Sequence, residues 1–584
     1  APLRVIFGNP PYSVGQKSAN DNAQNQKYER LDGRIADTYA KATKATNKNS
    51  LYDSYIKAFR WSADRIDPQA GGVIAFVTNG SWIDGNAQDG FRKTLEKEFS
   101  SIWVFNLRGN QRTSGELSRK EGGKIFGSGS RTPIALTFLV KNPNDKTGNA
   151  EIHYRDIGDY LTREEKLAKI GKLASVSNSE IRWETLEPNE HGDWITLRND
   201  AFQSFIPIAT ETQFDTKTES IFVLHSPGSQ SNRDPWVYNS SRAELLRNIE
   251  RTISSYNELV SKYVAIRETN PNATVDSVIE RDEQRIKWTP SLLLQLERQN
   301  NVAFQPESVR VGLYRPYFKQ QLYLGEKLIH RPAKSETFFP PGDFHNRVIC
   351  ISGVGDTKSF STLVADVTPD VQLQSNGQCF PLYYYEETKK ANPTLFDRNG
   401  QPEYIRRDGI SDFILGRARE QYGNKVTKED IFYYVYGFLH SPEYREKFAN
   451  DLKKMLPRLP LVDRAEDFWA FSRAGRKLAD LHINYESVPP HPELEVTGVD
   501  SGNFRVGKMR FPDKKQKDTI SFNSSITVKN IPQKAYDYVV NGKSAIEWIM
   551  DRYQVKQDKP SGIINDPNDW SEEVGNPRYI LDLL

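Results

Sequence analysis

The sequence predicts an α/β fold for its first 150 residues, followed by a helical spacer and a mixed α+β region. Three observations predict this fold. Strand-like and helix-like segments alternate over residues 1–150, which is typical of an open α/β sheet. The run Val73-Ile74-Ala75-Phe76-Val77 is continuously apolar, as in strands buried within parallel sheets. Residues 241–300 carry an apolar stripe with helical spacing, and shorter strands follow it.

Within the first 150 residues, each element is assigned from its local pattern. Residues 3–8 predict a short buried strand, and the polar tract 13–50 predicts a long loop because it has almost no apolar periodicity. Tyr55 and Phe59 at core spacing predict a helix over 51–66. The remaining elements are strands at 73–77, 102–107 and 134–140, a helix at 91–99, and a Gly/Ser-rich basic loop at 109–132.

After Lys141 the pattern changes. Residues 151–235 are mixed, and residues 241–300 are predicted to be helical, with an apolar stripe that includes Leu245 and Tyr263. From about residue 306 the chain is rich in Pro, Tyr and short strands, with one clear helix near 430–440, and we expect most of these tyrosines to pack in the core. The predicted divisions are 1–150, 151–235, 236–305 and 306–584.

Composition limits the class of protein. The formal charge is +3, but residues 1–150 hold 22 Lys and Arg against 14 Asp and Glu, so their net charge is +8. A basic segment of this size is a candidate contact surface for a polyanion. Two cysteines cannot build a disulfide framework, and no apolar run approaches the roughly 18 residues of a membrane helix. With no leader pattern at the N-terminus, we expect a soluble, cytoplasmic protein without membrane contact.

The most informative motif is Asn9-Pro10-Pro11-Tyr12, directly after the first strand. The prolines stiffen the turn and remove backbone donors, so acceptors face the site. The Asn9 side-chain oxygen and the Pro10 carbonyl then both accept hydrogen bonds from one planar amino group, and Tyr12 stacks on the ring that carries it. Such a site orients a weakly nucleophilic sp² amino group without a metal or a strong base.

This tetrapeptide resembles motif IV of the amino-methyltransferases that use S-adenosylmethionine. The segments near 55–59, 73–82 and 124–140 look like motifs V, VI and VIII of these enzymes. The resemblance implies the C-terminal part of a Rossmann-like methyltransferase sheet over residues 1–150, with 151–235 as its edge and linker. It also makes Phe126 a candidate to stack on an extruded base, although Phe126 could equally anchor its loop.

The same tetrapeptide serves protein and RNA methyltransferases, but those are compact, and more than 430 residues follow the catalytic strands here. We therefore expect double-stranded DNA, from which the target base must be flipped out. Adenine N6 is favoured over cytosine N4 because the cytosine enzymes more often have Ser in place of Asn9. The predicted contacts to the DNA backbone are Lys17, Lys27, Arg112, Arg119, Lys120, Lys124 and Arg131.

A second resemblance covers nearly the whole chain and is to the Type ISP restriction–modification enzymes. Its blocks are Ser226-Pro227-Gly228 with Arg233-Asp234-Pro235-Trp236, Tyr314-Arg315-Pro316-Tyr317-Phe318-Lys319, residues 430–444, and Val539-Val540-Asn541-Gly542-Lys543-Ser544 with residues 563–570. The resemblance implies methylation of adenine in a specific asymmetric DNA site to mark self DNA. It makes 236–305 a helical spacer and 306–584 the target-recognition domain.

In that family a nuclease, an ATPase, a coupler and the glycine-rich motif I that grips S-adenosylmethionine precede this region, whereas only eight residues precede Asn9. We therefore expect a piece of a longer enzyme, inactive by itself, whose ATP and Mg requirements belong to the other domains. Gly542-Lys543-Ser544 superficially suggests a phosphate-binding loop, but Asp537 stands where that motif needs Gly. The eight histidines show no metal spacing, so we expect no metal site.

The target-recognition candidates are Arg315, Lys319, Lys327 and Arg331, in a predicted strand–turn–strand stretch. The structural alternative for Arg315 is a buried arginine paired with a carboxylate. Two other functions stay open at this point: a DNA-binding specificity module without activity of its own, and a protein or RNA amino-methyltransferase.

Overall fold

The computed structural model describes most of the chain and divides it into two compact units, Ala1–Asp200 and Ala201–Leu584. The described residues are 3–12, 26–43, 45, 47–113, 115–127, 131–210, 212–325, 327–356, 358–388, 403–513 and 516–584. Within them, no helix combines the length and apolar character that crossing a membrane requires. The sequence predicts four segments, with a boundary after residue 150. In the structure, residues 151–200 lie in the same unit as residues 1–150.

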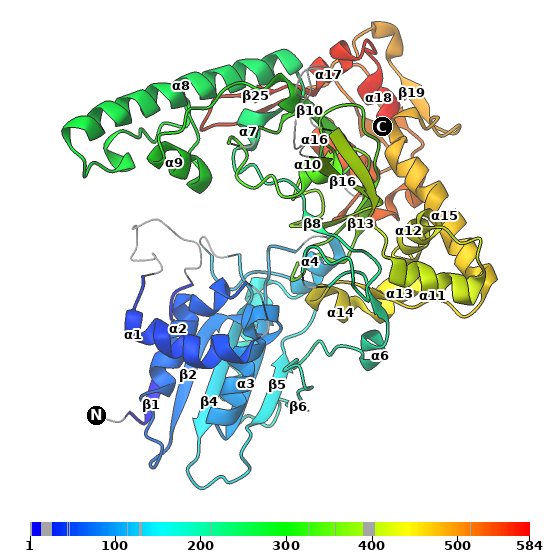
Figure 1. The fold of residues 1–584 in the computed structure, drawn as a ribbon. Coiled ribbons are helices and arrows are strands. Elements are labelled where there is room, and N and C mark those ends of the chain that lie inside the picture. Colours follow the sequence, from blue (N-terminus) through cyan, green and yellow to red (C-terminus); the bar gives the residue numbers. More distant parts are fainter. Residues whose placement is uncertain are drawn as a thin grey trace. The chain divides into compact units, whose positions relative to one another are not determined.

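The first unit is built on a six-stranded mixed sheet (Figure 1). Its strands are β1 (Val5–Gly8), β2 (Gly72–Asn79), β4 (Ile134–Lys141), β3 (Ser101–Arg108), β5 (Glu151–Asp156) and β6 (Glu184–Leu186), in that spatial order. β1 runs parallel to β2 and β3 runs parallel to β5, whereas β4 is antiparallel to both of its neighbours. The predicted strands at 73–77, 102–107 and 134–140 are confirmed as β2, β3 and β4.

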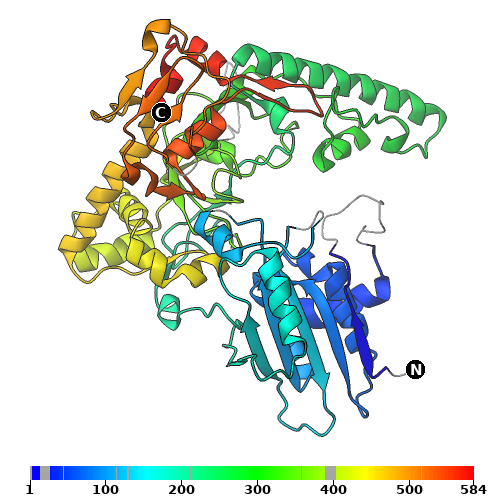
Figure 2. The same cartoon turned by 180° about the vertical axis from the view of Figure 1, so that it is seen from behind.

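Helices cover both faces of this sheet. They are α1 (Glu29–Ile35), α2 (Ser54–Ala63), α3 (Asp89–Glu98), α4 (Gly115–Glu121) and α5 (Arg163–Leu173). Phe59 of α2 and Phe91 of α3 both pack edge to face against Trp82 and lie tilted against each other, so these two helices share one core. Figure 2 shows α5 in front of the sheet, on the face opposite α1 and α2. The predicted helices over 51–66 and 91–99 are confirmed: α2 is shorter than predicted, and α3 begins and ends earlier.

Three expectations for the first unit are wrong. β1 is not buried: Val5 is 64% exposed and Phe7 80%, because β1 pairs with β2 alone among the described strands and only Ile6 packs on the core. The tract 13–50 is not one loop, because α1 and a π-helix (Ala36–Ala40) lie within it and bury Ile35 and Tyr39. Similarly, α4 lies inside the segment 109–132.

The second unit combines small sheets with helices. Its strands are β7 (Ile206–Pro207), β8 (Ser226–Pro227), β9 (Tyr238–Asn239), β10 (Val309–Arg315), β11 (Phe318–Tyr323), β12 (Val348–Ile351), β13 (Thr362–Ala365), β14 (Thr368–Pro369), β15 (Gln378–Pro381), β16 (Tyr383–Thr388), β17 (Glu403–Asp408), β18 (Arg458–Leu459), β19 (Glu495–Thr497), β20 (Ile520–Ser521), β21 (Thr527–Lys529), β22 (Val539–Val540), β23 (Lys543–Ser544), β24 (Lys556–Gln557) and β25 (Ile564–Asn565). Two four-stranded sheets, β14-β10-β11-β9 and β13-β12-β15-β8, form its centre.

The helices of the second unit include one long helix, α8, which carries the predicted stripe. Their bounds are α7 (Asp234–Val237), α8 (Arg242–Thr269), α9 (Pro290–Glu297), α10 (Ser335–Phe338), α11 (Asp412–Tyr422), α12 (Lys428–Phe438), α13 (Pro442–Lys447), α14 (Ala449–Lys454), α15 (Ala465–Ile483), α16 (Ala545–Arg552), α17 (Pro567–Glu573) and α18 (Tyr579–Leu583), while α6 (Asp200–Gln203) spans the unit boundary. Leu245 and Tyr263 of α8 are buried, as expected, and the segment 241–300 holds both α8 and α9, with mostly non-helical residues 270–289 between them. The predicted helix near 430–440 is confirmed as α12.

The tightest helix contact of the second unit joins α12 to α15. A Cβ atom on Gly475 would lie 2.0 Å from the Tyr433 carbonyl oxygen, and one on Gly437 would lie 2.4 Å from that of Phe471. Only glycine allows the two backbones to approach so closely. Tyr433 and Tyr434 are buried beside this contact, which confirms the expectation that these tyrosines form core.

Candidate functional site

The motif Asn9-Pro10-Pro11-Tyr12 follows β1 at one edge of the first unit's sheet. β1, β2 and β3 point in the same direction, because β4 is antiparallel to both β2 and β3. Their carboxyl ends therefore meet at this edge, together with the start of β4. Ligands of open α/β sheets bind at such an edge. Asn9 and Pro11 are exposed, and Tyr12 is half-buried.

Within the motif, Tyr12 closes onto Asn9. The Tyr12 hydroxyl donates a hydrogen bond of 3.3 Å to Asn9 Oδ1. The ring of Tyr12 meets that of Tyr55 edge to face, with 6.0 Å between the centroids. Burial, followed by the charge of Asp53, raises the pKa of Tyr12, so its hydroxyl keeps its proton at neutral pH. In this arrangement a neighbouring hydroxyl uses one of the two lone pairs of the oxygen that is expected to bind an amino group.

A hollow of about 1400 Å³ lies beside the motif, entirely within the first unit. Asn9, Pro10 and Pro11 line one part of it, while Tyr28 and Trp61 line another. Ion pairs stiffen its wall: Lys57 Nζ lies 2.9 Å from Asp32 Oδ1, and Arg34 and Arg60 both bind Asp64. The hollow therefore combines backbone and amide acceptors with aromatic rings.

The structure brings Phe126 into the same neighbourhood as Tyr12. Both half-buried rings pack against one small apolar cluster formed by Phe105, Leu107, Ile125, Ile134 and Ile157. Phe126 therefore packs against part of the core, as its anchoring alternative requires, and it also lies at the edge that carries the motif. Both sequence-based readings of this residue remain compatible with its position.

The basic candidates of the first unit occupy different settings. Lys17 lies outside the described residues. Lys27, Arg112, Arg119 and Arg131 are exposed, whereas Lys120 and Lys124 are half-buried. One guanidinium nitrogen of Arg131 donates to the Gln111 carbonyl at 3.1 Å, which ties the end of the basic segment to its start. Apart from Lys27, these described candidates lie between β3 and β4, beside the motif.

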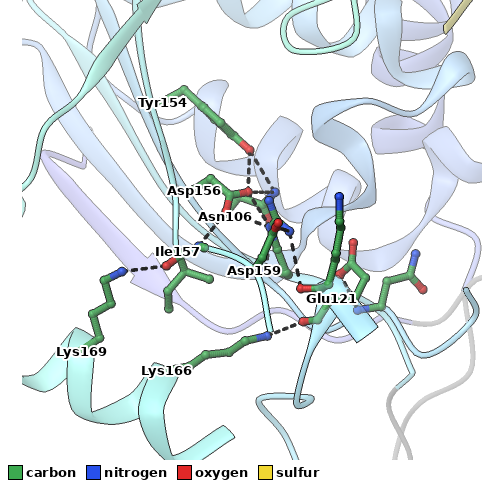
Figure 3. A network of polar contacts seen from close by, with 12 residues as sticks. Asn106, Glu121, Tyr154, Asp156, Ile157, Asp159, Lys166 and Lys169 are labelled. Atoms are coloured by element: carbon green, nitrogen blue, oxygen red, sulfur yellow. Dashed lines mark hydrogen bonds and ion pairs between the residues drawn. The ribbon is translucent and has the colours of Figure 1, made fainter. Parts of the chain in front are cut away.

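A polar network, not identified from the sequence, holds the basic segment in place (Figure 3). Lys166 of α5 is fully buried, and its ammonium donates to the carbonyls of Glu121 at 2.7 Å and Gly123 at 2.8 Å. Burial is the main cause that lowers the pKa of Lys166. The sequence does carry a signal for this role, since Lys166 stands four residues before Ile170 on the apolar stripe of α5.

Arg108 completes this network at the end of β3. Its Nε donates to both carboxylate oxygens of Asp156 at 2.8 Å, and its guanidinium also binds Asp159. Lys169 donates to the Ile157 carbonyl at 2.8 Å, as Figure 3 shows. The network therefore connects α5, the end of β5 and the basic segment, and it orients the surface beside the motif.

In the second unit, Arg315 follows the structural alternative. Its guanidinium binds Asp370 Oδ1 at 2.7 Å, lies 3.6 Å from Asp234, and stacks over the Tyr314 ring with its Cζ 3.8 Å from the centroid. The side chain is 13% exposed. Arg315 is therefore part of a buried ion-pair cluster, and in this structure it does not present a free guanidinium.

The other target-recognition candidates differ from one another. Lys319 binds Glu486 at 2.6 Å, and Lys327 donates to the Asn301 carbonyl at 2.7 Å. Arg331 is exposed. The predicted strand–turn–strand is confirmed by β10 and β11, and of these four cations Lys327 and Arg331 are exposed. Among the described residues, no group of three or more His, Cys, Asp or Glu is placed to hold a metal ion.

Comparison with known proteins identifies relatives over the whole chain. The family model of the Type ISP C-terminal specificity domain matches residues 220–583. The structure of a nuclease-deletion mutant of the Type ISP restriction–modification enzyme LlaGI, in complex with a DNA substrate mimic, is 42% identical with a TM-score of 0.86. That comparison covers 100% of this chain and 43% of LlaGI.

Two further solved structures are similar. The ATP-dependent Type ISP enzyme LlaBIII, bound to DNA, is 38% identical with a TM-score of 0.87, over 100% of this chain and 36% of LlaBIII. DrdV, in a complex with DNA, is 29% identical with a TM-score of 0.82, over 100% of this chain and 55% of DrdV. The chain thus spans less than half the length of the two Type ISP structures. No curated protein sequence matches it. The specificity-domain match covers more than half of the chain, and on this basis the chain belongs to the Type ISP restriction–modification family.

Proposed function

We propose that this chain forms the methyl-transferring and target-recognising part of an enzyme that methylates adenine N6 within a specific, asymmetric site in double-stranded DNA. The observation that carries the proposal is the position of Asn9-Pro10-Pro11-Tyr12 at the carboxyl end of β1, beside the cluster that Tyr12 shares with Phe126. An exposed amide, a proline carbonyl and two aromatic side chains at one sheet edge suit an extruded base that carries an amino group.

The residues of the motif have distinct roles in this proposal. The N6 amino group donates one hydrogen bond to Asn9 Oδ1 and one to the Pro10 carbonyl, which holds its nitrogen in position and increases its nucleophilic character. Asn9 Oδ1 already accepts a 3.3 Å hydrogen bond from the Tyr12 hydroxyl, and its second lone pair remains for the amino group. The Tyr12 ring then stacks on the adenine.

S-adenosylmethionine would supply the methyl group. Asn9 and Pro10 line the open hollow at the end of β1, where the cofactor would meet the amino group. Among the described strands β1 pairs only with β2, so its other side offers no further residues to hold the cofactor. We assign no described residue of this chain to the cofactor itself. The proposal covers only what Asn9, Pro10 and Tyr12 do to the amino group that receives the methyl.

DNA is the proposed partner because two kinds of observation agree. Arg112, Arg119 and Arg131 are exposed beside the motif, where phosphate contacts would hold a distorted duplex. LlaGI, LlaBIII and DrdV were solved with DNA or a DNA mimic. We assign target recognition to the second unit, since the specificity-domain family model matches residues 220–583. Nuclease and ATP-driven steps belong to the remainder of a longer enzyme.

The test is single-molecule sequencing of genomic DNA from cells that express the intact enzyme or an Asn9→Ala variant. We expect N6-methyladenine at one short asymmetric motif, reduced at least 100-fold by Asn9→Ala. Asn149→Ala serves as the matched control, since Asn149 is an exposed asparagine of the same unit. Methylation that survives Asn9→Ala would overturn the proposed role of the motif.

One observation favours a second candidate function, a DNA-binding specificity module. The family model matches only the specificity region, which lies wholly within the second unit. This alternative predicts sequence-selective DNA binding without any modified adenine in the same experiment.

A further inference from the structure

We propose that the second unit carries a phosphate-binding site formed by Lys358, Lys543, Arg552 and Lys556, here called the four-cation cluster. The ligand is a phosphate group, which we assign to the backbone of bound DNA. The inference rests on the proposed DNA-binding function and identifies one place where the second unit contacts the duplex. None of these four residues is among the target-recognition candidates derived from the sequence.

A tight hairpin fixes the position of Lys543. β22 and β23 are antiparallel, and the two residues that join them, Asn541 and Gly542, have positive φ values of 48° and 84°. An Asn-Gly pair with this backbone is typical of two-residue type I′ turns. Ser544 then caps α16 by accepting from the Glu547 N–H. The Gly-Lys-Ser sequence is therefore a turn and a helix cap, which leaves the Lys543 side chain as a point charge rather than part of a nucleotide loop.

Asn541 joins this hairpin to the segment that carries Lys358. Lys358 Nζ donates to Asn541 Oδ1 at 2.8 Å, and the Asn541 N–H donates to Ser361 Oγ at 3.0 Å. Asn541 is 6% exposed, so this junction is buried and fixed. The acceptor that holds the ammonium group of Lys358 is a neutral amide, and the positive charge of Lys358 therefore adds to that of the hairpin.

Three further cations converge on one carboxylate near the end of α16. Asp551 lies 2.8 Å from Lys543 Nζ, 3.0 Å from an Arg552 guanidinium nitrogen and 3.6 Å from Lys556 Nζ. Burial raises the pKa of Asp551, but the hydrogen bond from Lys543 and the nearby positive charges outweigh it and keep the carboxyl ionised. One carboxylate cannot neutralise three cations.

The surplus of positive charge contributes to lowered pKa values of two lysines in the cluster. Burial lowers the pKa of Lys358 and of Lys556, and the charges of Lys543 and Arg552 lower both further. Asp356 and Asp551 are the carboxylates that act on these two lysines in the opposite sense. Two carboxylates against four cations leave the cluster with a net charge of +2.

The cluster is open enough to accept a ligand. The side chains of Lys543 and Lys556 are 40% and 45% exposed, while that of Arg552 is 24% exposed. Lys543 and Arg552 also lie over the Trp548 ring, at 4.9 Å and 5.4 Å from its centroid, which restricts where their charged ends point. Fixed, half-exposed cations in surplus favour a phosphate, which accepts several charge-assisted hydrogen bonds at once.

The experiment uses the whole chain and two double variants. Lys543→Gln/Lys556→Gln removes two cations, whereas Lys543→Arg/Lys556→Arg keeps both charges and checks that substitution itself is tolerated. Lys425→Gln/Lys477→Gln is the matched control, since both lysines are exposed elsewhere on the same unit. Fluorescence anisotropy measures affinity for a random-sequence duplex at several salt concentrations, and circular dichroism checks the fold.

We expect the Gln double variant to bind DNA about 10-fold more weakly, and the slope of log affinity against log salt to fall by about 0.9 for each lost phosphate contact. The Arg double variant and the control should stay within about twofold of the wild type. A Gln double variant that binds like the control would overturn the DNA-backbone assignment.

A second arm separates the two sources of phosphate. Binding of pyrophosphate and ATP is measured by calorimetry with the wild type and the Gln double variant. If DNA binding is unchanged but nucleotide binding is lost, the phosphate site stands and its source is a nucleotide. If neither changes, the proposal is overturned. A wild-type chain that binds no DNA would contradict the proposed function, while the pyrophosphate arm would still test the cluster.

Discussion

The edge of the first unit's sheet and the β10–β11 turn of the second unit both carry cations, but the two regions use them differently. Arg112 and Arg131 are exposed between β3 and β4. Arg315 and Lys319 have side chains only 13% and 14% exposed, and each is paired with a carboxylate. The carboxylate partners come from positions 370 and 486, far along the chain. The comparison teaches that distant partners decide whether an arginine stays exposed or stabilises the fold.

The largest expected effect follows from removing one partner of the buried pair. Arg315→Ala should lower the free energy of unfolding by about 3–5 kcal/mol, because it leaves Asp370 buried without its cation. Arg112→Ala, at an exposed position, should change it by less than about 0.5 kcal/mol. Urea unfolding of both variants measures the difference.

The same pair has a pH signature. Burial raises the pKa of Asp370 to about 7, against the opposing charge of Arg315. Without Arg315 the pKa of Asp370 in the folded state rises further, whereas the carboxyl of the unfolded chain keeps its ordinary, lower pKa. Above pH 7 the folded variant therefore still holds a proton that the unfolded chain has already released. The cost of Arg315→Ala should therefore grow as pH increases above 7. An Arg315→Ala variant that is as stable as the wild type but loses sequence selectivity would show that Arg315 reads bases.

The second-largest effect appears at acid pH, because His440 and His482 of the second unit have strongly lowered pKa values. Burial lowers the pKa of His440 to about 3 and that of His482 to about 4. The unfolded state, with a histidine pKa of about 6.5, binds these protons first. Stability should therefore fall below pH 6.5, by about 1.4 kcal/mol per pH unit for each histidine.

The measurement compares unfolding free energies at pH 6.5 and 4.5. We expect His440→Asn to lose about 2–3 kcal/mol less than the wild type over this interval. His345→Asn is the control, because the His345 side chain is 93% exposed. Identical pH dependence in His440→Asn and the wild type would contradict the expectation.

A smaller effect tests the network that holds the first unit's basic segment. Lys166→Met should lower stability by about 1–3 kcal/mol, because the carbonyls of Glu121 and Gly123 lose their buried donor. Hydrogen exchange should become faster over residues 115–127. Lys172→Met, which removes a 72% exposed lysine of the same helix that lies outside this network, should leave these amides unchanged. If the two variants show equal protection from hydrogen exchange over residues 115–127, Lys166 does not position the basic segment.

The smallest effect concerns the Tyr12 hydroxyl. Tyr12→Phe keeps the ring and removes only the 3.3 Å hydrogen bond to Asn9, so the methylation rate of the intact enzyme should stay within about threefold of the wild type. Tyr12→Ala removes the stacking surface and should slow methylation about 10- to 100-fold. Single-turnover methylation measures both. A Phe variant as slow as the Ala variant would assign the chemistry to the hydroxyl instead of the ring.

Local patterns predicted most elements of the first unit. The runs that became β2, β3 and β4 and the stripes of α2 and α3 are dense in apolar residues, so their position is clear from a few neighbouring residues. α1 escaped detection because Leu31, Ile35 and Tyr39, four residues apart, are the sparse apolar positions in a polar tract. The exposure of β1 was also missed, since an apolar run does not reveal that one face stays uncovered.

The sequence by itself determined the four-residue motif, in which amide, proline carbonyl and aromatic ring follow one another and need no distant partner. It also determined the family, through blocks of residues spread over the chain. Only the tertiary structure decided that Phe126 shares a cluster with Tyr12, that Lys166 holds the basic segment, and that Arg315 is paired. The physical reason is that a buried charge or ring is defined by the groups around it, and chain folding brings those groups from far along the sequence.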